Sequence, residues 1–210
     1  MIYYILHQDL NIVQYISFRA AGAAITALLI SFLVGPKIIR TLKYHHFGEK
    51  IRKNGPTLHL HKEGTPSMGG IIILLSIILP TILWARLDNH YIIIILVATI
   101  WMGIIGFIDD YLKIKKHYSK GLIARYKLGG QIILGVFISY IIFNTNSSIG
   151  YNIISSNNIF SSIPSSSISI PFVANGYLDI NFLYIPLIIL IVTATSNSVN
   201  LSDGLDGLAT

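Results

Sequence analysis

Two adjacent carboxylates, Asp109 and Asp110, close a long apolar run at residues 91–108. Neighbouring negative charges repel one another, so at the end of an apolar helix they tend to hold protons unless a cation neutralises them. Lys113 and the lysines after it could supply that cation, and so could Mg²⁺, which prefers carboxylate oxygens with water and substrate phosphates. The pair therefore predicts a phosphate-handling site. The alternative is a solvated helix end in which the aspartates are paired with lysines.

A second polar stretch, residues 54–70, lies directly before another apolar run. Its glycines let the backbone approach a ligand, and Lys62, Thr65 and Ser67 supply a cation and two hydroxyl groups. This composition suits a phosphate or a nucleotide, although the order of Gly, Lys and Ser/Thr is not that of a Walker loop. The alternative is a turn into a membrane helix whose Gly-Gly pair allows close packing.

The third polar stretch, residues 197–208, begins at Asn197 and follows the last apolar run. If it is helical, Asn200, Asp203 and Asp206 recur at a spacing of three and present an amide and two carboxylates on one face. Its two glycines could instead break the helix and leave the same groups on a loop. A plain C-terminal cap followed by surface residues is the remaining alternative.

The elements that must position these groups lie in lipid. The chain has 210 residues, of which 53% are hydrophobic and only 11% are charged, far below the roughly 25% of an ordinary soluble domain. The absence of cysteine excludes disulfides, thiolate metal sites and cysteine nucleophiles. The histidines lack the spacing of a zinc site, since His59 and His61 are only two residues apart.

Five segments are apolar enough to cross the roughly 30 Å hydrocarbon core. We therefore predict an all-α polytopic membrane protein of about five transmembrane helices, in a single integral membrane domain over residues 1–210. No signal peptide is expected, because the first 17 residues carry no Lys or Arg, and the N-terminus is expected to form a short interfacial segment. The predicted spans are residues 18–39, 69–87, 91–108, 128–143 and 182–201.

The positive charges predict an orientation for these spans. Of the 15 Lys and Arg residues, all but Arg19 and Arg86 lie within residues 37–62 and 113–127, and the positive-inside rule places both stretches in the cytoplasm. A net charge of +6 then needs no nucleic acid to explain it. Residues 144–181 contain no Lys or Arg and are placed outside.

Short extended pieces are expected in that outer segment, between Pro164 and Pro171. The N-terminus is also placed outside, so five spans bring the C-terminus to the cytoplasmic side. All three polar stretches then share one membrane surface. That convergence is the strongest inference that the charges allow.

Together the three stretches closely resemble the phospho-N-acetylmuramoyl-pentapeptide transferases, bacterial membrane enzymes that make the first lipid intermediate of peptidoglycan. The sister N-acetylhexosamine-1-phosphate transferases share the aspartate pair but not the segment GTPSMGG, and remain the alternative. The resemblance extends over essentially the whole chain. The matching segments are RKNGPTLHLHKEGTPSMGG, GFIDDYLKIKKHYSKGLIARYK and NSVNLSDGLDGLA.

The resemblance implies Mg²⁺-dependent transfer of phospho-MurNAc-pentapeptide from UDP-MurNAc-pentapeptide to undecaprenyl phosphate, giving lipid I and UMP. It implies catalytic roles and Mg²⁺ binding for Asp109 and Asp110. A phosphate monoester with a second pKa of about 6 is already mostly dianionic at neutral pH, so metal positioning is expected of the pair rather than general-base catalysis. Substrate-binding roles are implied for Lys62, Thr65, Ser67, Lys113, Asn197, Asn200, Asp203 and Asp206.

The implied location is the bacterial inner (cytoplasmic) membrane, as a multi-pass protein. The implied partners are the two substrates and the lipid bilayer, with no nucleic acid, and the sequence leaves open whether the chain also forms a homodimer. Ser67 and Ser202 stand where the family usually has Thr, and the hydroxyl group is kept.

One departure from the family pattern affects the expected activity. Family members have about ten spans, and their second half carries the main metal ligand, a third aspartate, and a histidine-rich loop. The sequence stops at Thr210, so we expect the 210-residue chain to be incomplete for activity. A non-catalytic membrane remnant is the corresponding alternative.

Two further classes fit the sequence less well. The CDP-alcohol phosphotransferases begin their acidic pattern as Asp203, Asp206 and Gly207 do, but their later aspartates have no counterpart. A proton or cation transporter would place carboxylates at mid-span and show inverted repeats, and neither feature is visible.

Overall fold

The computed structural model of the chain describes seven parts of it: residues 2–6, 10–44, 68–115, 121–144, 164, 166–173 and 176–203. Of residues 6, 114–115 and 200–203 it describes only the backbone. The chain divides into two compact units, Met1–Ile123 and Ala124–Thr210. The single membrane domain expected over residues 1–210 stays a prediction.

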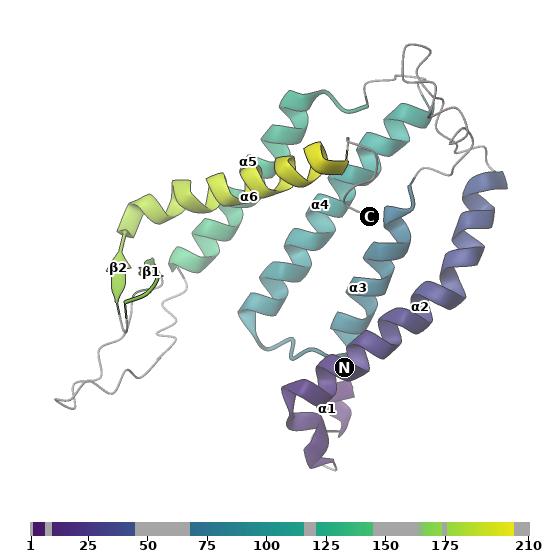
Figure 1. Ribbon diagram of the computed structural model, residues 1–210, viewed down its shortest axis with the longest axis horizontal. Coiled ribbons are helices and arrows are strands. Elements are labelled where there is room, and N and C mark those ends of the chain that lie inside the picture. The colour runs from purple at the N-terminus through teal and green to yellow at the C-terminus, as the bar shows by residue number, and fades with distance from the viewer. Residues whose placement is uncertain are drawn as a thin grey trace. The chain divides into compact units, whose positions relative to one another are not determined.

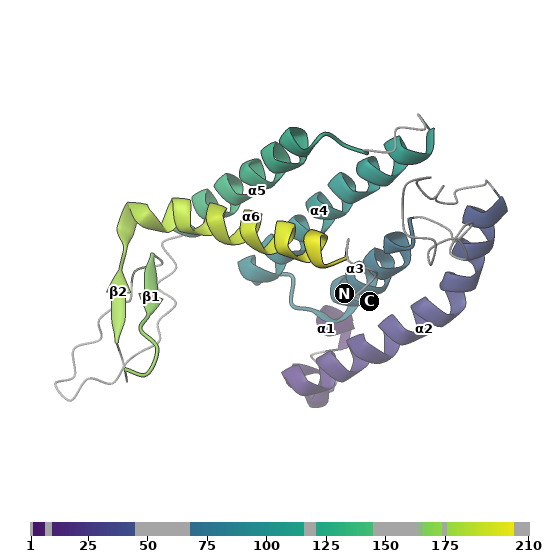
Figure 2. The ribbon, with the colours of Figure 1, turned by 45° about the horizontal axis from the view of Figure 1, so that its top comes forward.

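The first unit is a row of three helices preceded by a short N-terminal segment. α3 packs against both α2 and α4, and α1 contacts α3. Figures 1 and 2 show α2, α3 and α4 lying alongside one another. The elements of the first unit are α1 (Ile2–Leu6), the 3-10 helix η1 (Asn11–Gln14), α2 (Ile16–Tyr44), α3 (Gly70–Trp84) and α4 (His90–Lys115).

The second unit is a helix pair, α5 and α6, with a small hairpin before α6. The two strands are antiparallel, with Ser167 opposite Asp179 and Ser169 opposite Tyr177. The first strand confirms the extended piece expected before Pro171, whereas the second was not predicted. The elements are α5 (Ala124–Asn144), β1 (Ser167–Ser169), β2 (Tyr177–Asp179), the 3-10 helix η3 (Asn181–Leu183) and α6 (Tyr184–Asp203).

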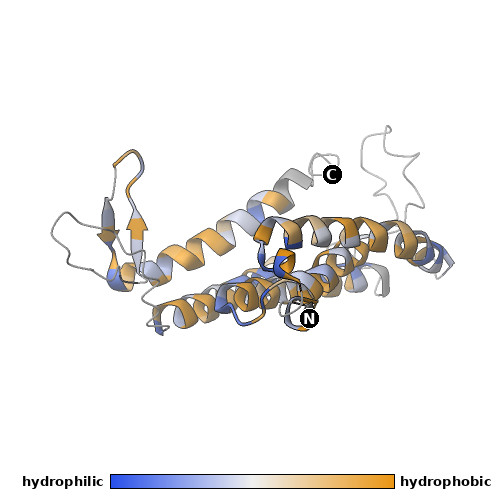
Figure 3. Cartoon of the chain, turned by 90° about the horizontal axis from the view of Figure 1, so that it is seen from below, coloured by the Kyte–Doolittle hydropathy of each residue, from blue (hydrophilic) through white to orange (hydrophobic). Residues whose placement is uncertain are grey.

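Most of the large apolar side chains on these helices are exposed rather than packed inside the protein. Figure 3 shows the apolar colour running along most of the helices. A soluble monomer rarely exposes apolar surface of this extent, whereas lipid covers it at no cost. The predicted fold class, a polytopic α-helical membrane protein, is confirmed. In the part of the chain that the structure describes, four helices are long and apolar enough to cross a membrane: Ile16–Tyr44, His90–Lys113, Ala124–Asn144 and Asn181–Val199.

The span predicted at residues 69–87 is shorter than expected, because α3 has only 15 residues. Met68, at a φ of 72°, interrupts helical geometry on one side, and Ala85, in an extended conformation, ends it on the other. At 1.5 Å per residue α3 is about 22 Å long, which a bilayer accommodates by local thinning. The five-span orientation stays a prediction.

Glycine residues allow the helices to approach closely in the α2–α3, α3–α4 and α5–α6 pairs. A Cβ atom on Gly135 of α5 would lie 2.9 Å from the Cα atom of Ile189 of α6, so only glycine allows this approach. Small residues at such contacts let membrane helices gain van der Waals packing, which is their main source of association. The side chains that lie over glycines in the other pairs are Trp84 over Gly22 and Leu74 over Gly103.

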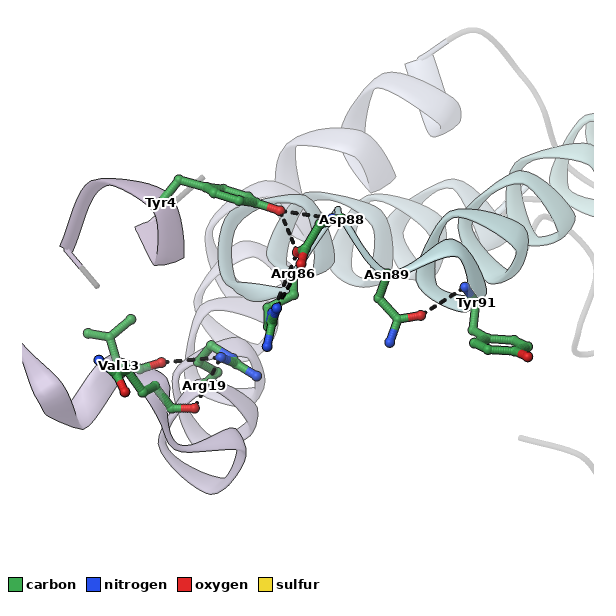
Figure 4. Close-up of polar contacts among 8 residues, drawn as sticks. Tyr4, Val13, Arg19, Arg86, Asp88, Asn89 and Tyr91 are labelled. Atoms are coloured by element: carbon green, nitrogen blue, oxygen red, sulfur yellow. Dashed lines mark hydrogen bonds and ion pairs between the residues drawn. The ribbon is translucent and has the colours of Figure 1, made fainter. Parts of the chain in front are cut away.

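A polar cluster joins the N-terminal segment to the loop between α3 and α4 (Figure 4). The Tyr4 hydroxyl donates to Asp88 Oδ1 at 2.7 Å and accepts from the Asp88 backbone N–H at 2.8 Å. Arg86 Nη2 lies 2.7 Å from Asp88 Oδ2. The hydrogen bond from Arg86, followed by that from Tyr4, holds the pKa of Asp88 well below its usual range.

The same cluster accounts for the two arginines that lie outside the basic stretches. The guanidinium groups of Arg19 and Arg86 lie over the Tyr3 ring, at 4.9 and 5.2 Å from its centroid. Arg19 also donates to the carbonyl oxygens of Val13 and Gln14, both at 3.3 Å. Both charges are therefore satisfied locally by the N-terminal segment and the loop.

Replacing Gly135 with valine should destabilise the α5–α6 pair by about 1–3 kcal/mol, because the new side chain overpacks the contact with Ile189. Thermal unfolding of the purified protein in detergent measures the effect. Gly129→Val is the matched control, since a Cβ at that position of α5 meets nothing within 4 Å. Equal losses in the two variants would contradict the packing role of Gly135.

Acidification should release α1 from the α3–α4 loop. Because the pKa of Asp88 is lowered in the folded protein, its contribution is fully present above about pH 4 and is lost as the pH falls further. Hydrogen exchange of the α1 amides, corrected for intrinsic rates, should show protection that declines below pH 4. In Asp88→Asn the protection should be weaker and independent of pH, whereas Asp179→Asn should behave as wild type. Protection that rises on acidification would contradict the role of the carboxylate.

Candidate functional site

The last turns of α4 bring Asp109, Asp110 and Lys113 together. The helix begins where Asn89 Oδ1 accepts the backbone N–H of Tyr91 at 2.9 Å, an N-terminal cap, and it continues without interruption to Lys115. In an α-helix, residues three and four apart lie on the same face. Lys113 is four residues after Asp109 and three after Asp110, so helix geometry alone brings its amine to both carboxylates.

Lys113 bridges the aspartate pair. Its Nζ atom lies 2.9 Å from Asp109 Oδ2 and 3.3 Å from Asp110 Oδ1. The Asp109 side chain is 14% exposed, whereas that of Asp110 is 35% exposed. One ammonium group thus offsets two adjacent negative charges. The less exposed carboxylate has the shorter contact.

The two carboxylates differ in what remains available to a ligand. Asp109 Oδ1 accepts the backbone N–H of Leu122 at 2.7 Å, so both of its oxygens are engaged. Asp110 Oδ2 has no hydrogen-bond or ion-pair partner in the part of the chain that the structure describes. Asp109 is therefore fixed by the protein, and Asp110 keeps one oxygen for a metal ion or substrate.

Gly121 makes the bond to Leu122 possible. Its φ of +59° is in the left-handed region, and a Cβ atom there would lie 2.5 Å from Asp109 Oδ1. A side chain would therefore be strained by the backbone and would also collide with the carboxylate. Glycine lets the chain fold back over the end of α4.

The second unit holds one of the predicted substrate-binding residues in a polar network between α5 and α6. Asn197 Nδ2 donates to Gln131 Oε1 and to the Thr193 carbonyl oxygen, each at 2.8 Å. Gln131 Nε2 donates to Ser196 Oγ at 2.9 Å. Gln131 is fully buried, although it lies in a candidate membrane span.

The other predicted site residues are described less fully. The backbone of α6 extends through Asn200 and Asp203, which favours the helical alternative for this stretch up to residue 203. Their side chains are outside the described residues. The same holds for the whole of Lys62, Thr65, Ser67 and Asp206. The structure thus brings together Asp109, Asp110 and Lys113, while convergence of all three polar stretches stays a prediction.

The aspartate pair has the chemistry of a magnesium site. Mg²⁺ is usually held by one or two carboxylates and completes its shell with water and substrate phosphates. Asp110 Oδ2, which has no partner among the described residues, would be the oxygen available to such an ion, with Asp109 beside it. Within the described residues, no group of three or more His, Cys, Asp or Glu side chains is placed to hold a metal ion.

Sequence reasoning missed two contributors to these sites, Gln131 and Gly121. Gln131 is one polar residue within the apolar segment 128–143, and an amide inside a membrane helix needs a partner. The cost of leaving that amide without a hydrogen bond predicts that Gln131 has a partner, but it does not indicate which residue the partner is. Gly121 carries no such signal, because a glycine after a lysine-rich stretch is common in any loop.

Comparison with known proteins agrees with the family predicted from the three polar stretches. Residues 92–210 match the pattern of glycosyl transferase family 4, and residues 62–74 match phospho-N-acetylmuramoyl-pentapeptide-transferase signature 1. A phospho-N-acetylmuramoyl-pentapeptide-transferase of Endomicrobium trichonymphae is 44% identical over 199 residues, covering 95% of this chain and 52% of the relative.

Two more relatives with the same name show similar coverage. That of Chlorobaculum parvum is 40% identical over 217 residues, covering 100% of this chain and 55% of the relative. That of Brachyspira hyodysenteriae is 44% identical over 210 residues, covering 95% and 54%. The chain spans about half the length of the curated relatives it matches. The family resemblance predicted from the three motifs is confirmed.

Replacing Gly121 with alanine should break the hydrogen bond between Leu122 and Asp109, because neither the φ nor the space tolerates a Cβ atom. A non-glycine residue held in such a conformation costs roughly 1–3 kcal/mol. We expect the Leu122 amide to exchange its hydrogen at least about tenfold faster, measured by NMR in detergent micelles. Gly106→Ala in α4 is the control, since a Cβ there meets nothing within 4 Å. An unchanged Leu122 exchange rate would contradict the assignment.

Proposed function

Because the chain belongs to glycosyl transferase family 4, we propose that its function is transfer of phospho-MurNAc-pentapeptide from UDP-MurNAc-pentapeptide to undecaprenyl phosphate. The observation that carries the proposal is the Asp109–Asp110–Lys113 cluster at the end of an apolar helix. In this reaction an oxygen of the lipid phosphate forms a bond to the sugar-linked phosphorus. The pyrophosphate bond breaks, and UMP leaves with the electron pair.

The cluster supplies the charge compensation that this transfer requires. Phosphoryl transfer is catalysed mainly by positioning and by neutralisation of charge on the phosphate oxygens. Mg²⁺, held by Asp110 with Asp109 beside it, would neutralise the diphosphate. Lys113, placed between the two carboxylates, offsets their charge and restrains their separation. The acceptor phosphate is already largely dianionic at neutral pH, so neither aspartate has to remove a proton.

The remaining roles follow the family resemblance. Lys62, Thr65 and Ser67 would bind the nucleotide sugar, together with a second group from the C-terminal stretch: Asn197, Asn200, Asp203 and Asp206. The match of residues 62–74 to the pentapeptide-transferase signature supports this substrate over an N-acetylhexosamine phosphate.

The proposed location is the cytoplasmic face of the bacterial inner membrane, where a lipid phosphate and a soluble nucleotide can meet. The distribution of Lys and Arg supports that face. A second copy of the chain as a partner stays a prediction.

Asparagine in place of Asp110 should lower UMP release on the order of 100-fold, because it removes a charge that acts on the transferred group. The same change should raise the Mg²⁺ concentration needed for half-maximal rate. The assay uses membranes with UDP-MurNAc-pentapeptide, undecaprenyl phosphate and Mg²⁺, and the gene is expressed with any sequence that follows codon 210.

Asp109→Asn should also reduce turnover, but with a second effect, faster exchange at the Leu122 amide, that Asp110→Asn lacks. Asp88→Asn, which changes a carboxylate of the α3–α4 loop, should leave UMP release unchanged. A wild-type protein without UMP release, or an Asp110→Asn variant with ordinary Mg²⁺ dependence, would refute the proposed function or the metal role respectively.

A further inference from the structure

The amide of Gln131 is enclosed between α5 and α6 and is hydrogen-bonded at both ends. The side chain has no exposed surface, its Nε2 atom lies 2.9 Å from Ser196 Oγ, and its Oε1 atom lies 2.8 Å from Asn197 Nδ2. A buried polar group in an apolar setting persists only when its partners are fixed. Gln131 therefore imposes a geometry on the residues it contacts.

Thr193 determines which way the Asn197 amide points. The Thr193 carbonyl oxygen can only accept a hydrogen bond, so the atom 2.8 Å from it must be the nitrogen of Asn197. A rotated amide would bring two oxygens together. The same nitrogen donates its other hydrogen to Gln131 Oε1, which leaves Gln131 Nε2 to donate to Ser196. One carbonyl thus orients the whole chain of amides.

The consequence is that Asn197 has used both of its donors. Its Oδ1 atom has no hydrogen-bond partner among the residues whose side chains the structure describes, and the side chain is half-buried. An amide oxygen accepts hydrogen bonds and repels phosphate oxygens. What Asn197 can offer a ligand is an acceptor alone.

The packing beside this network holds the two helices at the required distance. Gly135 lies one turn along α5 from Gln131, where α5 meets Ile189 of α6 with room for no Cβ. Leu134 and Ile188 are buried at the same contact, at 3% and 9% exposure. The amide of Gln131 therefore cannot withdraw from Asn197 without separating tightly packed helices.

We propose that Gln131 is a positioning residue that fixes Asn197 with its amide oxygen toward the substrate, so that Asn197 recognises a hydrogen-bond donor, an N–H or hydroxyl group of the nucleotide sugar. This inference rests on the proposed function and adds to it. It excludes the phosphates as the partner of Asn197 and leaves them to Lys113 and to the Mg²⁺ ion that the aspartate pair would hold.

The first test is structural and requires no turnover. In ¹⁵N-labelled protein in detergent micelles, the side-chain amide of Asn197 should be resolved and protected from exchange. Gln131→Leu should accelerate that exchange at least tenfold, whereas Ser139→Ala, which removes another buried polar group of α5, should not. Unchanged Asn197 signals in Gln131→Leu would overturn the proposal.

Gln131→Glu gives a signature that a merely structural role would not produce. A protonated glutamic acid keeps a carbonyl acceptor for Asn197 and an O–H donor for Ser196, whereas the ionised form places a charge with no counter-ion in the enclosed site, which relieves that cost by opening the α5–α6 contact. The KM of this variant for UDP-MurNAc-pentapeptide should therefore approach that of wild type at low pH and rise at least tenfold as the pH increases, with a smaller change in kcat. A KM that tracks wild type at every pH, with kcat alone reduced, would overturn the proposal.

The donor itself is identified with nucleotide-sugar analogues that each lack one donor, such as the N3-methyluridine and 2′-deoxyuridine forms. One analogue should bind at least tenfold more weakly to wild type but not to Asn197→Leu. If every analogue is discriminated equally by both proteins, Asn197 recognises no donor and the proposal is wrong. Protected Asn197 signals in a wild-type protein that releases no UMP would overturn the proposed function and the substrate half of this inference, while the pairing of Gln131 with Asn197 would stand.

Discussion

Every polar group placed within a hydrocarbon layer must find its partner inside the protein, because no water is available to provide one. The threonines of the long helices show the simplest response, in which the hydroxyl donates to a carbonyl of the preceding turn, as in Thr26, Thr99 and Thr195. Gln131 shows the other response, a bond across two helices. Ser76 and Trp84 are exceptions among the described residues, each with a buried polar atom that has no partner.

The same constraint shapes the aspartate pair. Carboxylates at the end of an apolar helix require a counter-charge, and Lys113 provides it from one turn further along the helix. The result is an asymmetric pair: Asp109 is fixed by Lys113 and by the Leu122 backbone, whereas Asp110 Oδ2 has no partner among the described residues. One residue is thereby suited to hold the geometry of the site and the other to contact a ligand. The two residues are of the same type, and they differ because only Asp109 lies beside the backbone N–H of Leu122.

What could be predicted from the sequence is what depends on local spacing. The helices and the Lys113 bridge follow from apolar runs and from neighbours three and four residues apart. The bonds from Leu122 to Asp109 and from Asn197 to Gln131 join residues 13 and 66 positions apart, and no local pattern encodes such separations. Helix α3 is shorter than the predicted span 69–87, because Ala85 leaves helical geometry inside that stretch and Met68 does so just before it. Hydropathy does not record backbone conformation.

The hydrogen bond between Asp109 and Leu122 also restrains the chain that follows α4. Ile123 alone separates Leu122 from Ala124, the first residue of α5, so the chain leaves the carboxylate and enters the next helix almost at once. The bond joins two positions 13 residues apart within the first unit, so the chain returns to the end of α4 before the second unit begins. The Asp109 carboxylate therefore holds a backbone position as well as a charge, and its loss would release the chain at Leu122 from the end of α4.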